Sequence, residues 1–146
     1  MVAGCDRSHE LPPVTAEPSD LERVAAFRSE LRRFVLRTNS AAAEAGLSPQ
    51  RYDLLLAIRS AGEVRVTELC DLLQLQQTAV TQLVKRTEEA GLVERRASAA
   101  DGRVWLLQLT AAGEALVQRM VVAARGEVSE LATALQQVGA SLHDVS

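Results

Sequence analysis

The sequence predicts a mainly α-helical fold that is interrupted once by a β-hairpin. Alanine, leucine and valine dominate a chain of 146 residues in which only 3% are aromatic, and long stretches lack the turn residues of an all-β protein. Apolar residues recur at helical spacing over most of the chain. The period changes only between Leu92 and Leu109, where two short runs of strand character flank Asp101-Gly102.

The first helix is expected to run from Ser19 to about Ala45. Residues 19–22 match a capping box. In this motif the Ser19 hydroxyl accepts a hydrogen bond from the third helical amide, and the Glu22 carboxylate accepts one from the Ser19 amide. Gly46 is the expected stop. One side of this helix carries apolar side chains and one threonine: Leu21, Val24, Phe27, Leu31, Phe34, Val35 and Thr38.

Three shorter helices are expected next. Ser48-Pro49 supplies a cap and a first turn for the second helix, which Gly62 ends. Residues 63–66 form a short extended piece, and Thr67 caps a third helix that reaches Leu73. After a turn at 74–76, the fourth helix runs from about 77 to 90 and stops at Gly91.

A hairpin and a last helix complete the chain. The strands are expected at 92–97 and 103–109, with a turn at 98–102. Thr110 caps the last helix, within which Gly126 marks a bend or an end. The expected order of elements is that of a winged helix-turn-helix: helix, helix, short strand, helix, turn, helix, hairpin, helix.

Composition excludes several classes. The net charge of −3 comes from the first twenty residues, which carry four acids against one arginine. Cys5 and Cys70 give no disulfide framework, and no apolar run reaches the length of a membrane span. The N-terminus lacks a signal pattern, so we expect a cytoplasmic protein with a flexible tail at 1–18. No metal cluster, cofactor loop or catalytic constellation stands out, and Cys5 with His9 is too few for a metal. We expect a non-enzyme without a cofactor.

The fourth helix is a candidate DNA reader. Its face opposite the apolar side holds Gln77, Thr78, Thr81, Gln82 and Lys85. A major-groove reader needs side chains that donate and accept at base edges, and cations near phosphates. The alternative is a solvated polar face of an ordinary helix.

The hairpin favours the DNA interpretation. Arg95 and Arg96 lie at its base, and Arg103 follows the tight turn. An arginine at a wing tip can enter the narrow minor groove. Asp101 is placed to hold the Arg103 guanidinium by a charge-assisted pair. The alternative is a surface ion pair of little energetic weight.

These residues carry a family resemblance. Residues 47–116 resemble the multiple-antibiotic-resistance regulator (MarR) family through LSPQRYDLLLAI, VTELCDLLQL, TAVTQLVKR, AGLVERRAS, DGR and LTAAGEAL. The specific part is GLVER, then D-x-R, then LT-x-x-G.

The resemblance implies a homodimer that binds pseudo-palindromic double-stranded DNA and acts as a transcriptional repressor. It implies a dimerisation helix at 19–46, a winged helix-turn-helix at 47–109 and C-terminal dimerisation at 110–146. It assigns base or phosphate contact to Gln77, Thr78, Thr81, Gln82, Lys85 and Arg86, and wing contact to Arg103 with Asp101 as positioner and Arg95 at the start of the wing.

The resemblance also implies release by a small lipophilic or aromatic molecule. It places that ligand near Phe34, Thr38, Tyr52, Leu56 and Met120, although such residues at helical spacing are also ordinary core. For Arg59 two roles are expected as alternatives: it fixes an anionic ligand, or it pairs with a carboxylate of the protein.

The chain departs from the family at Thr87, where leucine is usual. A buried threonine needs a partner such as a carbonyl one turn back. The last helix is also expected to be shorter than in the family, which affects the dimer geometry.

A winged-helix module that binds a protein and not specific DNA is the alternative function. Residues 51–105 carry eight cations and eight anions. If these segregate to opposite faces, DNA binding is favoured, and if they intermix, the interaction module is favoured.

Overall fold

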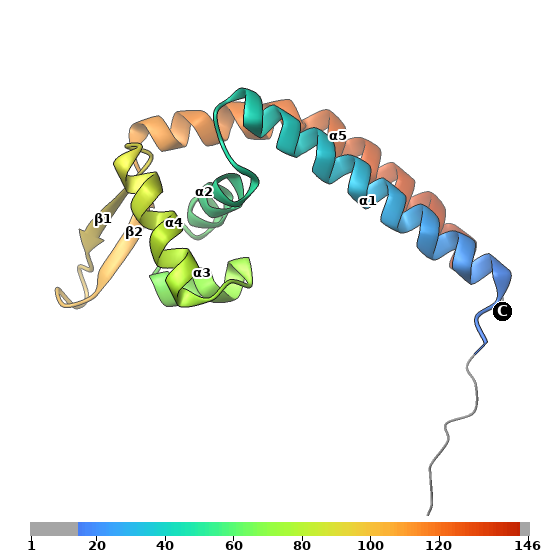
Figure 1. The fold of residues 1–146 in the computed structure, drawn as a ribbon, viewed down its shortest axis with the longest axis horizontal. Coiled ribbons are helices and arrows are strands. Elements are labelled where there is room, and N and C mark those ends of the chain that lie inside the picture. The colour runs from blue at the N-terminus through green and yellow to red at the C-terminus, as the bar shows by residue number, and fades with distance from the viewer. Residues whose placement is uncertain (1–14, 144–146) are drawn as a thin grey trace, which may run out of the picture.

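A computed structural model describes residues 15–143, and residues 1–14 and 144–146 lie outside the described part. Most of the expected tail, with Cys5 and His9, therefore falls outside it. Figure 1 shows an arm of two long helices joined to a smaller body. The arm is α1 (Pro18–Glu44) and most of α5 (Ala111–His143), and the body holds α2 (Pro49–Ala61), α3 (Val66–Leu73), α4 (Gln77–Glu89), β1 (Val93–Ala97) and β2 (Trp105–Leu109).

Helix α1 begins differently from the sequence prediction. Its N-cap is Glu17, which makes no side-chain capping bond, and Pro18 occupies the first turn. The predicted capping box at Ser19 is therefore wrong, because proline with its fixed φ starts the helix upstream and leaves Ser19 inside the first turn. The C-terminal end agrees with the prediction, since Gly46 adopts φ +77° after the cap at Ala45.

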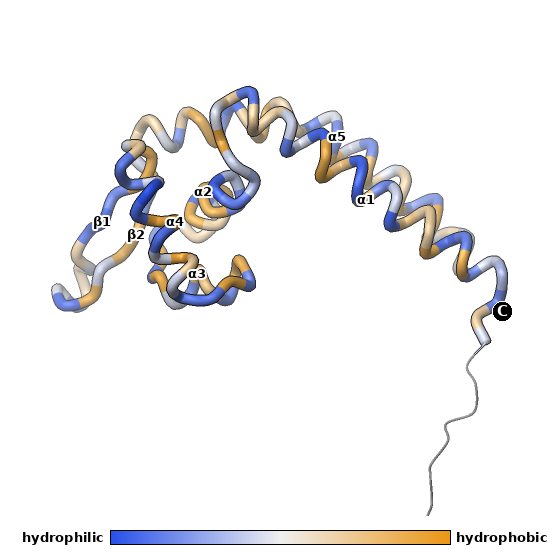
Figure 2. The backbone as a smooth tube through the Cα atoms, viewed as in Figure 1, coloured by the Kyte–Doolittle hydropathy of each residue, from blue (hydrophilic) through white to orange (hydrophobic). Residues whose placement is uncertain are grey.

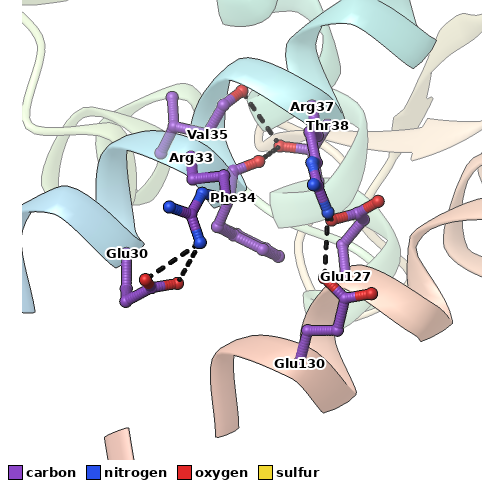
Figure 3. A network of polar contacts seen from close by, with 8 residues as sticks. All are labelled: Glu30, Arg33, Phe34, Val35, Arg37, Thr38, Glu127 and Glu130. Atoms are coloured by element: carbon purple, nitrogen blue, oxygen red, sulfur yellow. Dashed lines mark hydrogen bonds and ion pairs between the residues drawn. The ribbon is translucent and has the colours of Figure 1, made fainter. Parts of the chain in front are cut away.

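Helices α1 and α5 lie side by side along the arm (Figure 1). An ion-pair cluster ties them together: the Arg37 guanidinium lies 3.0 Å from Glu127 and 2.9 Å from Glu130 (Figure 3). The hydrogen bond and charge of Glu127, followed by the charge of Glu130, raise the pKa of Arg37 above its ordinary value. This exposed cluster is one of the contacts between the two helices.

The core of the body forms where α2 meets the other elements. Leu54, Leu55 and Ile58 of α2 are fully buried and cluster with Leu69, Val80 and Leu107. Helix α2 begins as predicted, because the Ser48 hydroxyl accepts a hydrogen bond from the Arg51 amide at 3.3 Å. It ends as predicted at Gly62, where φ is +81°. This framework orients α3, α4 and the hairpin.

Two other boundaries differ from the sequence prediction. Helix α3 starts at Val66 with Arg65 as N-cap, so Thr67 does not cap it; the Glu68 carboxylate instead accepts from the Arg65 amide at 2.7 Å. The wing turn is longer than predicted, because Arg103 and Val104 precede the second strand. A backbone bond from Ser98 to the Val104 carbonyl at 2.8 Å closes this wider loop.

Helix α5 is one continuous helix from Ala111 to His143. Gly126 therefore does not end it. Thr110 caps it as predicted: its hydroxyl accepts from the Gly113 amide at 3.1 Å and donates to the Gly91 carbonyl at 2.6 Å. Residues 139–143 continue this helix to the end of the described part.

The arm exposes a row of large apolar side chains. Figure 2 shows apolar segments recurring along α1 and α5. On α1, Leu21, Val24, Val35 and Leu36 are each about half exposed or more, and on α5 Val122 and Val128 are similar. We call the exposed apolar side chains of α1 and α5 the arm stripe. No helix in the described part is long and apolar enough to span a bilayer.

Candidate nucleic-acid interface

Helices α3 and α4 form the helix-turn-helix, and a tight turn fixes the angle between them. Gln74 takes the left-handed conformation at φ +56°, and the Leu75 amide donates to the Cys70 carbonyl at 3.1 Å. Helix α4 then buries one side, formed by Val80, Leu83, Val84 and Thr87. The opposite side of α4 is therefore left in solvent.

The exposed side of α4 holds every side chain that the sequence predicted for it. Gln77, Thr78, Thr81, Gln82, Lys85 and Arg86 are all exposed. Ala79 shares this surface and was missed, because an alanine gives no signal in a polarity pattern. No acidic residue stands between Gln74 and Thr87. The surface is neutral and polar near the N-terminus and cationic toward the C-terminus.

Thr87 is completely buried at the base of α4, and its hydroxyl donates to the Leu83 carbonyl at 2.7 Å. The prediction that a buried threonine here bonds one turn back is confirmed. Because the hydroxyl is satisfied inside its own helix, α4 packs on the body without leaving this buried polar group unpaired.

The hairpin docks against the C-terminal end of α4 through Arg95. Its strands pair in antiparallel register from Val93 with Leu109 to Ala97 with Trp105. The Arg95 Nε atom lies 2.9 Å from the Glu88 carboxylate of α4. Glu88 was not among the residues predicted from the sequence. Arg96 lies on the opposite face of the strand because side chains alternate, and it is exposed.

The wing turn is organised by side-chain bonds to the backbone. The Asp101 carboxylate accepts from the backbone amide of Arg103 at 3.0 Å, and the Ser98 hydroxyl accepts from the Ala100 and Asp101 amides. The predicted pair between Asp101 and the Arg103 guanidinium is therefore absent in the described part. In turns, an aspartate carboxylate commonly accepts a hydrogen bond from the backbone amide two residues later. The exposed Arg103 guanidinium is therefore without a partner among the described residues.

A mostly apolar cavity of about 520 Å³ lies where the arm meets α2. Phe34, Thr38, Tyr52 and Leu56 line it, as the resemblance implied. Other lining residues were not predicted from the sequence, including Asn39, Asp53 and Arg125. Burial raises the pKa of Asp53, and burial followed by the charge of Asp53 raises the pKa of Tyr52.

Two residues expected near the ligand lie elsewhere. Arg59 is outside the cavity, and its Nε atom lies 2.6 Å from the Glu114 carboxylate of α5. Of the two alternatives for Arg59, the pair with a carboxylate is the one that forms. Met120 is a buried core residue at 5% exposure and does not line the cavity.

Residues 15–143 contain one cysteine, Cys70. Cys70 is half-buried and its thiol donates to the Val66 carbonyl at 3.3 Å. In this part of the chain, no three His, Cys, Asp or Glu side chains come together as a metal site.

Comparisons with known proteins agree with this architecture. Residues 45–104 match the model of the MarR family. A curated protein of Bacillus subtilis (strain 168), the uncharacterized HTH-type transcriptional regulator YdgJ, is 32% identical over 73 residues, which are 50% of this chain and 44% of that protein. The match thus spans less than half of the relative.

Solved structures share the fold over nearly the whole chain. Wild-type apo MarR from E. coli superposes with a TM-score of 0.66 at 20% identity, covering 91% of this chain and 98% of that one. A mutant MarR from E. coli complexed with operator DNA superposes with a TM-score of 0.65 at 22% identity, covering 86% of this chain and 93% of that one. The transcriptional regulator Tm0710 from Thermotoga maritima superposes with a TM-score of 0.62 at 26% identity, covering 84% of this chain and 87% of that one.

The helix-turn-helix, the hairpin and the helical arm together define a winged helix-turn-helix protein. Its central segment, residues 45–104, is similar to the MarR family, and this match covers less than half of the chain. The fold of apo MarR from E. coli extends over 91% of the chain.

Proposed function

We propose that this protein is a cytoplasmic transcriptional repressor that binds a pseudo-palindromic duplex DNA site as a homodimer. The observation that carries this proposal is the exposed side of α4, which is free of acids from 74 to 87 and ends in Lys85 and Arg86. Glutamine and threonine side chains can pair with base edges, and the cations neutralise phosphates. Arg103 at the wing turn supplies the second contact, in the minor groove.

The charge distribution around α4 supports DNA binding over the protein-interaction alternative. Two of the eight cations in residues 51–105 are neutralised by partners, Arg59 by Glu114 and Arg95 by Glu88. Two of the anions accept hydrogen bonds from backbone amides: the Glu68 carboxylate from the Arg65 amide and the Asp101 carboxylate from the Arg103 amide. The cations without an acidic partner among the described residues include Lys85, Arg86, Arg96 and Arg103 on α4 and the hairpin. Glu89 and Glu94 are exposed on the same two elements, so the support comes from the acid-free stretch 74–87.

The arm stripe supports a homodimer. Exposed apolar side chains along α1 and α5 are unfavourable in water, and a second copy of the same arm buries them. Two α4 helices are then held at a fixed separation, so that they read two half-sites. The mutant E. coli MarR that was solved in complex with operator DNA supports the same mode of action.

A small lipophilic or aromatic effector is proposed to occupy the cavity between the arm and α2. The cavity borders both the arm and the body, so a ligand there can change the angle between them and with it the spacing of the two α4 helices. Compounds that release DNA from the unaltered protein should fail to release it from Leu56→Trp, which fills the cavity. Equal release from both proteins contradicts this assignment.

Selection from random duplex DNA at about 150 mM salt tests the function. Enrichment of a two-fold symmetric motif, with half-sites about one helical turn apart, is the expected result. No enrichment by a sample that is folded and dimeric overturns specific DNA binding and favours the protein-interaction module.

Two variants with matched controls test the assigned surface. Gln82→Ala should cost about 1–3 kcal/mol on the preferred site and relax one base position, whereas Arg103→Ala should weaken all duplexes and lower the salt slope by about 1. Gln136→Ala and Arg119→Ala, two exposed positions on α5, should leave binding unchanged. Equal loss on every sequence for Gln82→Ala contradicts base reading.

A further inference from the structure

Trp105 has no role in the packing or in the interface described above. It is the single tryptophan of the chain and opens strand β2. Its side chain is 58% exposed. Tryptophan is enriched at interfaces, because its ring is apolar and its N–H is polar, so an exposed indole is a candidate contact.

The indole lies where the hairpin leaves the protein body. Trp105 and Leu107 share one face of β2 because side chains alternate, and Leu107 is only 1% exposed. The exposed fraction therefore rises from 1% at Leu107 to 58% at Trp105, the next residue on the same face of the strand. The residue opposite Trp105 is Ala97, which offers only a methyl group to cover the ring.

This face of the hairpin is the one that meets α4. Arg95, on the same face as Ala97, pairs with Glu88 of α4. In Figure 1 the hairpin runs beside α4 and points away from the arm. Trp105 opens β2 and lies two residues after Arg103.

We propose that the Trp105 indole contacts the sugar-phosphate backbone of DNA, beside the groove that the wing enters. This inference rests on the proposed function. The ring face can pack on deoxyribose, and the indole N–H can donate to a phosphate oxygen.

The surroundings favour DNA over an apolar protein partner. The exposed residues around the ring at this end of the hairpin are small or polar: Ala97, Ala99, Ala100, Asp101, Gly102 and Arg103. Arg96 is exposed on the other face of the hairpin. Asp101 is engaged by the Arg103 amide, so the Arg103 guanidinium two residues before the ring remains available to a partner. A guanidinium beside an aromatic ring with no large apolar neighbour suits a polyanionic backbone with apolar sugars.

The single tryptophan makes the test direct. The full chain is titrated with a mixed-sequence duplex of about three helical turns at low salt, where phosphate contacts dominate. Indole fluorescence and binding anisotropy of labelled DNA are followed together. Trp105→Ala, Trp105→Phe and the control Leu72→Ala are compared; Leu72 is also 58% exposed, lies on α3 and lines a depression with α2 residues.

The expected result has three parts. Indole emission changes and saturates together with DNA binding. Trp105→Ala binds about three- to tenfold more weakly, while Trp105→Phe recovers part of the loss. The salt slope of Trp105→Ala stays unchanged because an uncharged group releases no counterion, whereas Arg103→Ala lowers it. Leu72→Ala binds as the unaltered chain does, and all variants keep its melting temperature.

Three results overturn the inference. If the chain binds DNA with no change in indole emission, and Trp105→Ala binds with the same affinity, the Trp105 contact is refuted and the proposed function stands. A change in sedimentation mass for Trp105→Ala places the ring between protein copies. Absence of binding by the unaltered dimer, even at low salt, overturns both the inference and the proposed function.

Discussion

Gly113→Ala and Gly126→Ala should change stability in opposite directions, although both glycines lie in α5. A Cβ atom at Gly113 would lie 2.0 Å from the Leu92 carbonyl oxygen, more than an ångström inside ordinary contact at 3.4 Å. A Cβ atom at Gly126 meets nothing within 4 Å. The glycine of LT-x-x-G is thus required by a close approach of α5 to the base of the hairpin.

The clash at Gly113 involves backbone and cannot be relieved by a rotamer change. The Leu92 carbonyl also accepts from the Thr110 amide at 3.0 Å, and the neighbouring Val93 is buried. Moving this strand costs about 1–3 kcal/mol as overpacking, against a helix-propensity gain of at most about 1 kcal/mol for alanine. Because backbone must move, the cost lies in the upper part of this range, about 2–3 kcal/mol, which leaves a net loss of about 1–2 kcal/mol, or about 3–8 °C in Tm.

Gly126→Ala carries only the propensity term, so it should gain about 0.5–1 kcal/mol. Urea unfolding followed by circular dichroism measures both variants, at one fixed protein concentration because dimer stability depends on it. Gly113→Ala should also weaken DNA binding, since the displaced strand carries the wing. If Gly113→Ala is as stable as Gly126→Ala, the close approach does not constrain this helix and the reasoning is refuted.

Three further predictions concern capping, pH and the wing. Thr110→Ala should lower the free energy of unfolding by about 0.5–2 kcal/mol through loss of the α5 cap, measured by urea unfolding; an unchanged midpoint contradicts this. Burial raises the pKa of Asp53 above its ordinary 3.8, so ionising it costs more in the folded chain. Asp53→Asn should therefore become more stable than the unaltered chain as pH rises above about 3.8, with the difference vanishing below that pH in pH-dependent melts. Arg95→Ala should leave the salt slope of DNA binding unchanged, because Glu88 already neutralises its charge; a slope lowered by about 1 would show a direct phosphate contact.

Local sequence signals predicted most element boundaries. Ser48-Pro49, Gly62, Gly91 and Thr110 act through their own backbone conformations and nearest amides, so their effect is readable from neighbours in sequence. The exposed side of α4 followed in the same way from helical periodicity. Where two local signals competed, as at Pro18 and Ser19, the pattern of residue types did not decide between them.

Pairings between distant segments were decided by the tertiary structure alone. Periodicity indicates that one side of a helix is buried, but not which neighbour buries it. Arg59 meets Glu114 and Arg95 meets Glu88 only because α5 and the hairpin fold back on α2 and α4. Asp101 turned to a backbone amide because the loop is wider than its turn dipeptide suggested. The cavity, with Asp53 and Arg125 in its lining, likewise depends on how the arm crosses α2. The sequence by itself therefore determined the elements and the exposed polar side of α4, and the tertiary structure decided which charged side chains are paired and which are not.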